Sequence, residues 1–266
     1  MFDPTRLESI VRAAGRMAMA RWPGAGFAVE SWEKSPGNPV CAADLEVDGF
    51  LKQELGALLP GSGWLSEETA DDTARLEREF VWLVDPIDGT RDFLKGRAGW
   101  GVSVALVEQG RPVAGLLCAP AREEMWSAYA GRGATRNGGA IRASQRHQMP
   151  GARIPLLDAA APFLDLERVN RPNAIALRVA MVAADEADVV SSVRWGHEWD
   201  IAAASLIAEE AGARVTDVHG ASLSFNKPDP RSFGIIACAP PLHGETQERL
   251  ARYMEERAAT SRDEAS

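Results

Sequence analysis

The 266-residue chain is poor in the features that mark several protein classes. Its three cysteines, Cys41, Cys118 and Cys238, lie far apart and form no CxxC pair. This set argues against a disulfide framework and a cysteine-rich zinc site, so we expect three reduced and mostly buried thiols. No stretch approaches the roughly 18 apolar residues of a membrane helix, and the N-terminus does not resemble a signal peptide. We therefore expect a cytoplasmic protein with no membrane partner.

Basic residues are outnumbered by acidic ones, and histidines are few. Lysine and arginine number 29 against 38 aspartates and glutamates, giving a net charge of −9, and there are four histidines. A nucleic-acid surface needs a basic face, so this charge argues against a nucleic-acid polymer as partner. An acidic protein that binds an anionic ester must reverse the sign locally, and bound divalent cations do this.

The hydrophobic pattern mixes helical and strand periods along the whole chain. Helical spacing covers 5–20, 42–58, 175–184, 199–211 and 243–258. Strand-like runs cover 80–84, 100–107, 113–119, 124–129 and 189–193. We expect the sheet to be closed by two further strands, at 214–217 and 233–239. Pro- and Gly-rich residues 22–40 predict a loop, and Asn137-Gly138 a hairpin turn. This mixture favours α/β or α+β layers, with one domain over 1–266 and lobes of about 1–145 and 146–266.

The most informative stretch is VWLVDPIDGTRDF at residues 81–93. A buried strand brings Asp85 to its carboxyl end, where ligands bind in α/β sheets, and Asp88 follows on a stiff turn. Two carboxylates this close repel each other unless a cation lies between them, and the Ile87 carbonyl offers a further oxygen for Mg²⁺. Gly89 permits a sharp turn, and a short helix starting at Thr90 would present backbone amides to an anion. The alternative is that both aspartates only cap a turn.

Three other segments place acids at similar positions. Glu67 and Glu68 follow a short apolar run, Asp200 starts the predicted helix over 199–211, and Asp44 lies at another helix start. Each has a simpler interpretation, because acidic pairs are usually exposed and aspartate is a common helix cap.

Together these four segments resemble the inositol monophosphatase superfamily. The matching motifs are PVxxAD at Pro39–Asp44, SEE at Ser66–Glu68, DPIDGT at Asp85–Thr90 and EWDIAAA at Glu198–Ala204. The order and spacing match along nearly the whole chain. The resemblance implies a five-layered αβαβα sandwich of the inositol monophosphatase and fructose-1,6-bisphosphatase type, and a magnesium-dependent phosphomonoesterase.

The resemblance also implies roles for individual residues. Two or three Mg²⁺ ions would be held by Glu67, Asp85, the Ile87 carbonyl, Asp88 and Asp200, with Asp44 assisting through water. Glu67 and Thr90 would orient a metal-activated water as nucleophile. The amides of Gly89 and Thr90 would bind the phosphate, beside Asp88 and Asp200.

The sequence says less about the substrate. The run WLVDPIDGTRDFLKGR, Glu198 before Trp199-Asp200, and LSFNKPDP at 223–230 look more like bacterial 3′(2′),5′-bisphosphate nucleotidases, so 3′-phosphoadenosine 5′-phosphate is the expected substrate. Inositol-1-phosphate is the alternative, followed by histidinol phosphate and fructose-1,6-bisphosphate. A second phosphate needs a cation away from the metals, and Arg194, Lys227 and Arg231 are the candidates.

Two departures from the family pattern are present. Cys41 replaces the usual threonine of the PVTxAD motif, and Asn173-Ala174 stands where many members have Gly-Ser.

A non-catalytic, metal-binding member of the family is the alternative from a different functional class, and retention of Glu67, Thr90 and Asp200 weighs against it. The resemblance leaves both a homodimer and a monomer open.

Overall fold

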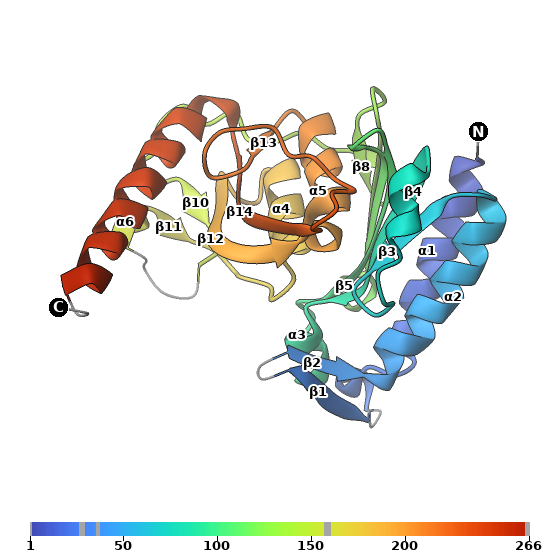
Figure 1. Ribbon diagram of the computed structural model, residues 1–266. Helices are drawn as coiled ribbons and strands as arrows, with labels where there is room; N and C mark the ends of the chain where they lie inside the picture. The colour runs from blue at the N-terminus through green and yellow to red at the C-terminus, as the bar shows by residue number, and fades with distance from the viewer. Residues whose placement is uncertain (1, 27–29, 36–37, 157–160, 264–266) are drawn as a thin grey trace.

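The computed structural model describes residues 2–26, 30–35, 38–156 and 161–263, and it has five layers (Figure 1). Helices α1 (Pro4–Met19) and α2 (Ala42–Leu58) cover one face of a seven-stranded sheet. Helices α4 (Ile175–Ala183) and α5 (Glu198–Glu210) lie between this sheet and a three-stranded one, and α6 (His243–Asp263) covers the outer side. The predicted α/β class and the αβαβα layers are confirmed.

The large sheet has the strand order β3-β4-β5-β6-β7-β8-β9, and β3 and β4 are its one parallel pair. Its strands are β3 (Gly63–Ser66), β4 (Phe80–Asp88), β5 (Gly101–Glu108), β6 (Arg111–Ala119), β7 (Glu124–Tyr129), β8 (Ala134–Arg136) and β9 (Gly139–Ala140). The four strands predicted between residues 80 and 129 are confirmed. Asn137 and Gly138 both have positive φ, as the predicted hairpin turn requires.

The small sheet corrects one expectation. Its order is β12-β14-β13, with every pair antiparallel. The strands are β12 (Val189–His197), β13 (Arg214–Thr216) and β14 (Arg231–Cys238). The segments 214–217 and 233–239 therefore do not close the large sheet. The physical reason is that α4 and α5 are buried on two sides and separate the sheets.

The Pro- and Gly-rich segment over 22–40 also differs from its predicted loop. β1 (Ser31–Ser35) and β2 (Asn38–Cys41) form an antiparallel pair that leads into α2. Proline is tolerated in such a short two-stranded edge, where one missing amide leaves few ladder bonds unmade. The remaining short elements are β10 (Arg153–Ile154), β11 (Glu167–Arg168), α3 (Thr90–Leu94), η1 (Pro23–Ala25), η2 (Thr73–Glu77), η3 (Pro120–Arg122), η4 (Ala161–Phe163) and η5 (Pro240–Leu242).

Apolar side chains fill the spaces between the layers. The fully buried indoles of Trp82 and Trp100 lie beneath α1 and α2, and Trp126 lies on the opposite face of the large sheet. A third cluster packs α6 against the small sheet. Burial of several large side chains in each cluster stabilises the stacking of the layers. All three cysteines are free and buried, as predicted.

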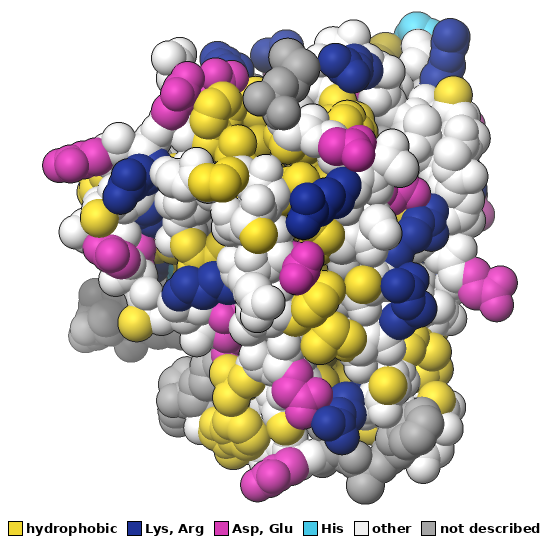
Figure 2. Space-filling model, turned by 90° about the vertical axis from the view of Figure 1, so that its right-hand side faces the viewer, with side chains coloured by type: hydrophobic (Ala, Val, Ile, Leu, Met, Phe, Trp, Pro, Cys, Tyr) yellow, Lys and Arg dark blue, Asp and Glu magenta, His cyan; other side chains and the backbone are white. Residues whose placement is uncertain are grey.

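The outer face over α1 and α2 has no single charge sign. Figure 2 shows this face with acidic, basic and apolar side chains interspersed. Among the described residues, no helix is long and apolar enough to cross a bilayer.

Candidate active site

Carboxylates from three distant segments meet beside the end of β4. Asp85 lies in β4, Glu67 directly follows β3, and Asp200 lies in the first turn of α5. Because β3 pairs in parallel with β4, Ser66 stands opposite Val84, and the amide of Glu67 donates a 3.2 Å hydrogen bond to the Val84 carbonyl. One carboxylate oxygen from each of the three acids lies within 4.8 Å of the other two.

The turn around Ile87 is fixed by its own hydrogen bonds. Pairing between β4 and β5 shifts between Asp85 and Asp88, so the chain bulges at Pro86 and Ile87. The amide of Ile87 donates to Asp85 Oδ1 at 3.1 Å, and the Thr90 hydroxyl donates to the Ile87 carbonyl at 3.0 Å. The sequence therefore builds a rigid turn that holds the Asp85 carboxylate in place.

Gly89 closes this turn in a conformation that requires glycine. Its φ is +90°, and a Cβ there would lie 2.7 Å from the Gly99 carbonyl oxygen and 2.9 Å from the Ala174 nitrogen. The next residue, Thr90, begins α3 as predicted. The backbone around the Asn173-Ala174 departure is held by bonds from Asn173 N to Asp92 Oδ2 at 3.0 Å and from Ala174 N to the Gly99 carbonyl at 2.9 Å.

Asp88 is oriented differently from the other three acids. Its Oδ2 accepts a 2.7 Å hydrogen bond from the Ala176 amide and its Oδ1 a 3.3 Å bond from the Ile175 amide, both in the first turn of α4. Asp88 lines the same cleft, of about 600 Å³, as Glu67, Asp85 and Asp200. Its carboxylate thus joins β4 to α4 at the wall of the cleft.

The crowded carboxylates disfavour one another's ionisation. Burial, followed by the charges of Glu67, Asp88 and Asp200, raises the pKa of Asp85 well above its usual range. Burial and the charge of Asp88 raise the pKa of Asp200 in the same way. Burial raises the pKa of Asp88 to about 6 against the opposing effects of the Ala176 amide and Arg178. A divalent cation among these oxygens would favour the charged forms again.

Asp44 and Asp48 support the cleft from α2. Asp44 is buried at the N3 position, where its Oδ2 accepts a 2.8 Å bond from the Cys41 amide and a 2.9 Å bond from the Cys41 thiol. Burial and the nearby Asp44 charge raise the pKa of Cys41 to about 12, so this thiol keeps its proton and donates it. Cys41 thereby supplies the donor that a threonine hydroxyl would provide.

Asp48 is a residue that the sequence reasoning missed. It accepts hydrogen bonds from the Ser66 hydroxyl and, at 2.6 Å, from the Thr69 hydroxyl. These bonds attach the segment that contains Glu67 to α2. The spacing could have indicated that Asp48 lies beside Asp44, because residues four apart share one helix face.

Arg178 was also missed, and it is a buried cation that borders the carboxylates. It lies in α4, lines the cleft, and donates to the Ala174 carbonyl at 3.3 Å and the Asn173 carbonyl at 3.2 Å. Burial, together with the nearby Arg171, lowers the pKa of Arg178 to about 10. The sequence gives little indication of this role, because a single arginine within an apolar helical run is usually an exposed side chain.

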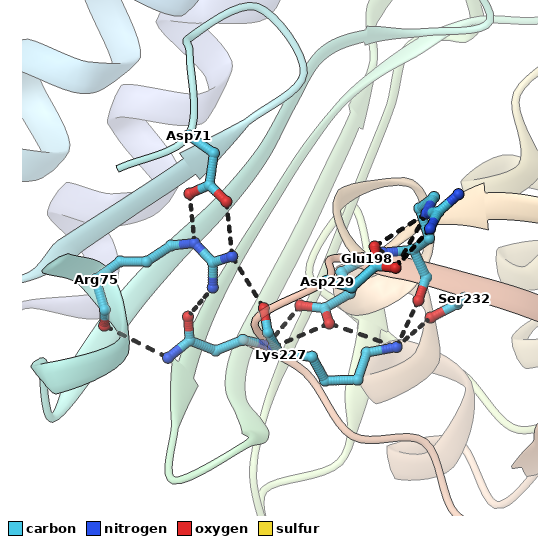
Figure 3. A network of polar contacts seen from close by, with 8 residues as sticks. Asp71, Arg75, Glu198, Lys227, Asp229 and Ser232 are labelled. Carbon is cyan, nitrogen blue, oxygen red and sulfur yellow. Dashed lines mark hydrogen bonds and ion pairs between the residues drawn. The ribbon is translucent and has the colours of Figure 1, made fainter. Parts of the chain in front are cut away.

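Glu198 and Lys227 hold in place the loop between β13 and β14 (Figure 3). The buried Glu198 carboxylate accepts bonds from the amides of Asn226 at 2.5 Å and Lys227 at 3.1 Å. The Lys227 ammonium donates to the Arg231 carbonyl at 2.7 Å and the Ser232 hydroxyl at 3.1 Å, and lies 3.6 Å from Glu198. Lys227 does not line the cleft among the residues described there. Its binding of a second phosphate stays a prediction, which these contacts do not support.

Arg75 holds the same loop from the other side (Figure 3). Its guanidinium binds Asp71 at 2.7 and 2.9 Å, the Asn226 side chain at 2.6 Å and the Lys227 carbonyl at 2.9 Å. These contacts link η2 to the loop before β14 and so connect the two halves of the chain. The loop is thus held between η2 and Glu198 at the start of α5.

The other candidate cations and His197 lie near the mouth of the cleft. Arg194 borders a neighbouring pocket, and Arg231 pairs with Asp229 at 2.7 Å and lies over the exposed ring of Trp195 at 5.4 Å. The His197 ring stacks on Trp199 with centroids 4.4 Å apart and planes 6° apart. Its backbone amide donates to Asp200 Oδ2 at 2.8 Å, which orients that carboxylate at the start of α5.

Comparison with known proteins adds to this geometry. The sequence profile of the inositol monophosphatase family matches residues 5–259. A Streptomyces griseus protein named glucose-1-phosphate thymidylyltransferase is 36% identical over 227 residues, which are 80% of this chain and 87% of that protein. The 3′(2′),5′-bisphosphate nucleotidase CysQ of Salmonella typhimurium is 31% identical over 227 residues, or 81% of this chain and 91% of that protein. The structure of a Thermotoga maritima IMPase covers 94% of this chain and 96% of its own, with a TM-score of 0.81 and 27% identity.

Proposed function

The chain belongs to the inositol monophosphatase family and is a hydrolase of phosphoric monoesters, and we propose that Glu67, Asp85 and Asp200 hold the Mg²⁺ that its reaction needs. The observation that carries this proposal is the approach of three carboxylate oxygens to within 4.8 Å of one another. Such crowding costs free energy unless a cation lies among the oxygens, and an all-oxygen donor set suits Mg²⁺. Two or three ions, with the Ile87 carbonyl and Asp88 as further ligands, complete the proposed site.

Bound Mg²⁺ would neutralise charge on the phosphate and acidify a water for attack. The chain's own residues would position the reactants. Glu67 is half-buried at the cleft and Thr90 has its hydroxyl 3.0 Å from the Ile87 carbonyl, so the two can hold the attacking water. The Gly89 and Thr90 amides would hold the phosphate, and buried Asp44 would add negative charge behind Asp85.

For the substrate we favour a 3′(2′),5′-bisphosphate nucleotide such as 3′-phosphoadenosine 5′-phosphate. Support comes from the 31% identity with a nucleotidase of that name and from the cations beside the cleft, Arg178 and Arg194. Inositol monophosphate is the second candidate, supported by the similarity to the Thermotoga maritima IMPase. The bisphosphate nucleotide carries a second phosphate and inositol monophosphate does not. Only the nucleotide therefore needs a further group of cations beside the cleft.

Organisation and compartment are part of the same proposal. The ligands come from both proposed lobes, Glu67 and Asp85 from residues 1–145 and Asp200 from residues 146–266. The three free thiols fit a reducing compartment, so we place the enzyme in the cytoplasm.

The test uses purified protein stripped of metal with EDTA. Hydrolysis of the bisphosphate nucleotide, inositol-1-phosphate, histidinol phosphate and fructose-1,6-bisphosphate is then followed before and after Mg²⁺ is added. We expect activity to appear with Mg²⁺ and kcat/KM to be highest for the bisphosphate nucleotide. Full activity after exhaustive chelation would contradict the metal dependence, and a higher kcat/KM for inositol-1-phosphate would reverse the order of substrates.

A further inference from the structure

A second pocket, of about 820 Å³, opens beside the carboxylate cleft and is rich in positive charge. Arg91 and Asn173 line both spaces, so the two are contiguous. The cations of this basic pocket are Arg91, Lys95, Arg97, Arg122, Arg171 and Arg194. Asp92 is the one acidic residue among the described residues that line it. In a chain with a net charge of −9, this is a local reversal of sign.

Two of these cations are neutralised by neighbours. Arg97 forms an ion pair with Asp92, and Arg122 forms one with Glu124 at 2.8 Å. Within the described ranges, Lys95, Arg171 and Arg194 make no ion pair with a carboxylate. The basic pocket therefore retains positive charge that the protein itself does not balance.

Arg171 and Arg194 act on each other across the pocket. Arg171 is half-buried, and burial followed by the charge of Arg194 lowers its pKa. Both also oppose the charge on Arg178, which lines the cleft. Arg171 and Arg194 line the basic pocket and Arg178 lines the adjoining cleft, so α4, β12 and the loop before α4 each bring one guanidinium group to the border between the two spaces. An anion between them would relieve this repulsion.

We propose that Arg171 and Arg194 bind a second phosphate group of the substrate while the carboxylate cleft holds the phosphate that is cleaved. Guanidinium groups suit this role because each can donate two parallel hydrogen bonds to phosphate oxygens. The assignment rests on the proposed phosphatase function and differs from the sequence expectation for Lys227, whose ammonium group is engaged at β14. It makes the basic pocket a selector for bisphosphates.

The experiment compares 3′-phosphoadenosine 5′-phosphate, the bisphosphate, with 3′-AMP. The second compound has the same 3′-phosphate and lacks the 5′-phosphate. We expect wild-type kcat/KM to be at least about tenfold higher for the bisphosphate, as charge-assisted hydrogen bonds to one phosphate imply. Arg171→Met and Arg194→Met should remove most of that ratio, because kcat/KM should fall further for the bisphosphate than for 3′-AMP. The matched control is Arg132→Met, an exposed arginine in the turn before β8, which should keep the full ratio. A wild-type ratio near one, or an unchanged ratio in both variants, overturns the proposal.

Binding of 5′-AMP tests the pocket without turnover, because this nucleotide carries only the second phosphate. Isothermal titration should show at least about tenfold weaker binding to Arg171→Met and Arg194→Met than to wild type and Arg132→Met. Equal affinities in all four proteins overturn the assignment. If the wild type hydrolyses no monoester with Mg²⁺, the proposed function fails, and the 5′-AMP result still decides the role of the basic pocket. Circular dichroism of each variant identifies any loss of fold.

Discussion

The Asp88 carboxylate accepts a 2.7 Å hydrogen bond from the Ala176 amide, which ties the end of β4 to the first turn of α4. The first amides of a helix have no partner within the helix and carry partial positive charge, so a carboxylate is a favourable partner for them. The large sheet and the helical layer are thereby held together at the wall of the cleft. Asp88 has a structural role as well as its proposed one as a metal ligand.

Asp88→Asn should impair activity. At saturating Mg²⁺ we expect kcat to fall at least about a hundredfold, as loss of a metal ligand should cause. Asp72→Asn is the control, since Asp72 caps η2 through a 3.0 Å bond to the Ala74 amide and lies outside the cleft. Wild-type turnover of Asp88→Asn would refute its role as a ligand.

Asp85→Asn should raise metal-free stability or leave it unchanged. Asp85 is buried among other acids, so removing its charge relieves repulsion. In EDTA we expect a Tm equal to or above that of wild type, whereas added Mg²⁺ should raise the Tm of wild type and not that of the variant. A clear drop of the variant's Tm in EDTA would show that Asp85 is stabilised by other contacts.

The Cys41 thiol should contribute to stability through its bond to Asp44. Cys41→Ala removes a donor to a buried carboxylate, so it should cost about 1–2 kcal/mol more than Cys118→Ala. Cys118 is the matched control because it is also a buried, free thiol and has no hydrogen bond to a carboxylate. Cys41→Ser should recover part of the difference. Equal losses in the two alanine variants would show that the bond to Asp44 adds nothing.

Asp188 should make stability depend on pH in the acid range. It is buried and accepts bonds from the Arg153 amide at 2.8 Å and from the Arg153 guanidinium at 3.0 and 2.8 Å. Burial raises its pKa, but the bonds from Arg153 and Ser144 outweigh this and lower the pKa to about 2. Because the unfolded-state pKa is about 3.9, the contribution is complete above that pH and is lost as the pH falls toward about 2. The gap in unfolding free energy between wild type and Asp188→Asn should narrow between pH 5 and pH 2. A constant gap would contradict this assignment.

Much of the fold followed from local patterns in the sequence. The helix at 5–20 has strong apolar periodicity, those at 42–58 and 199–211 are long runs of good helix formers, and the buried strand before Asp85 is a short β-branched and aromatic run, so their positions were predictable. The pairing of residues 31–35 with 38–41 was not, because Pro and Gly favour a loop locally. The second sheet was missed for a related reason, since strand periodicity does not tell which sheet a strand joins.

The candidate site divides in the same way. Glu67, Asp85 and Asp200 were predicted because each lies in a recognisable motif at the end of a strand or the start of a helix, and the structure brings them together. Arg171 and Arg178 could not be found, because their importance comes from like charges that meet only after folding. Lys227 was predicted to bind phosphate because it lies in a motif that resembles the nucleotidases. In the structure its ammonium group instead donates to the Arg231 carbonyl and holds its own loop in place.

The most direct test of the central claim is a crystal of the protein soaked in Mn²⁺, which scatters anomalously and substitutes for Mg²⁺ at oxygen sites. The account predicts an anomalous peak within coordination distance of oxygens from Glu67, Asp85 and Asp200, and a weaker peak or none in Asp85→Asn. A wild-type crystal at saturating Mn²⁺ with no peak among these three carboxylates would contradict it.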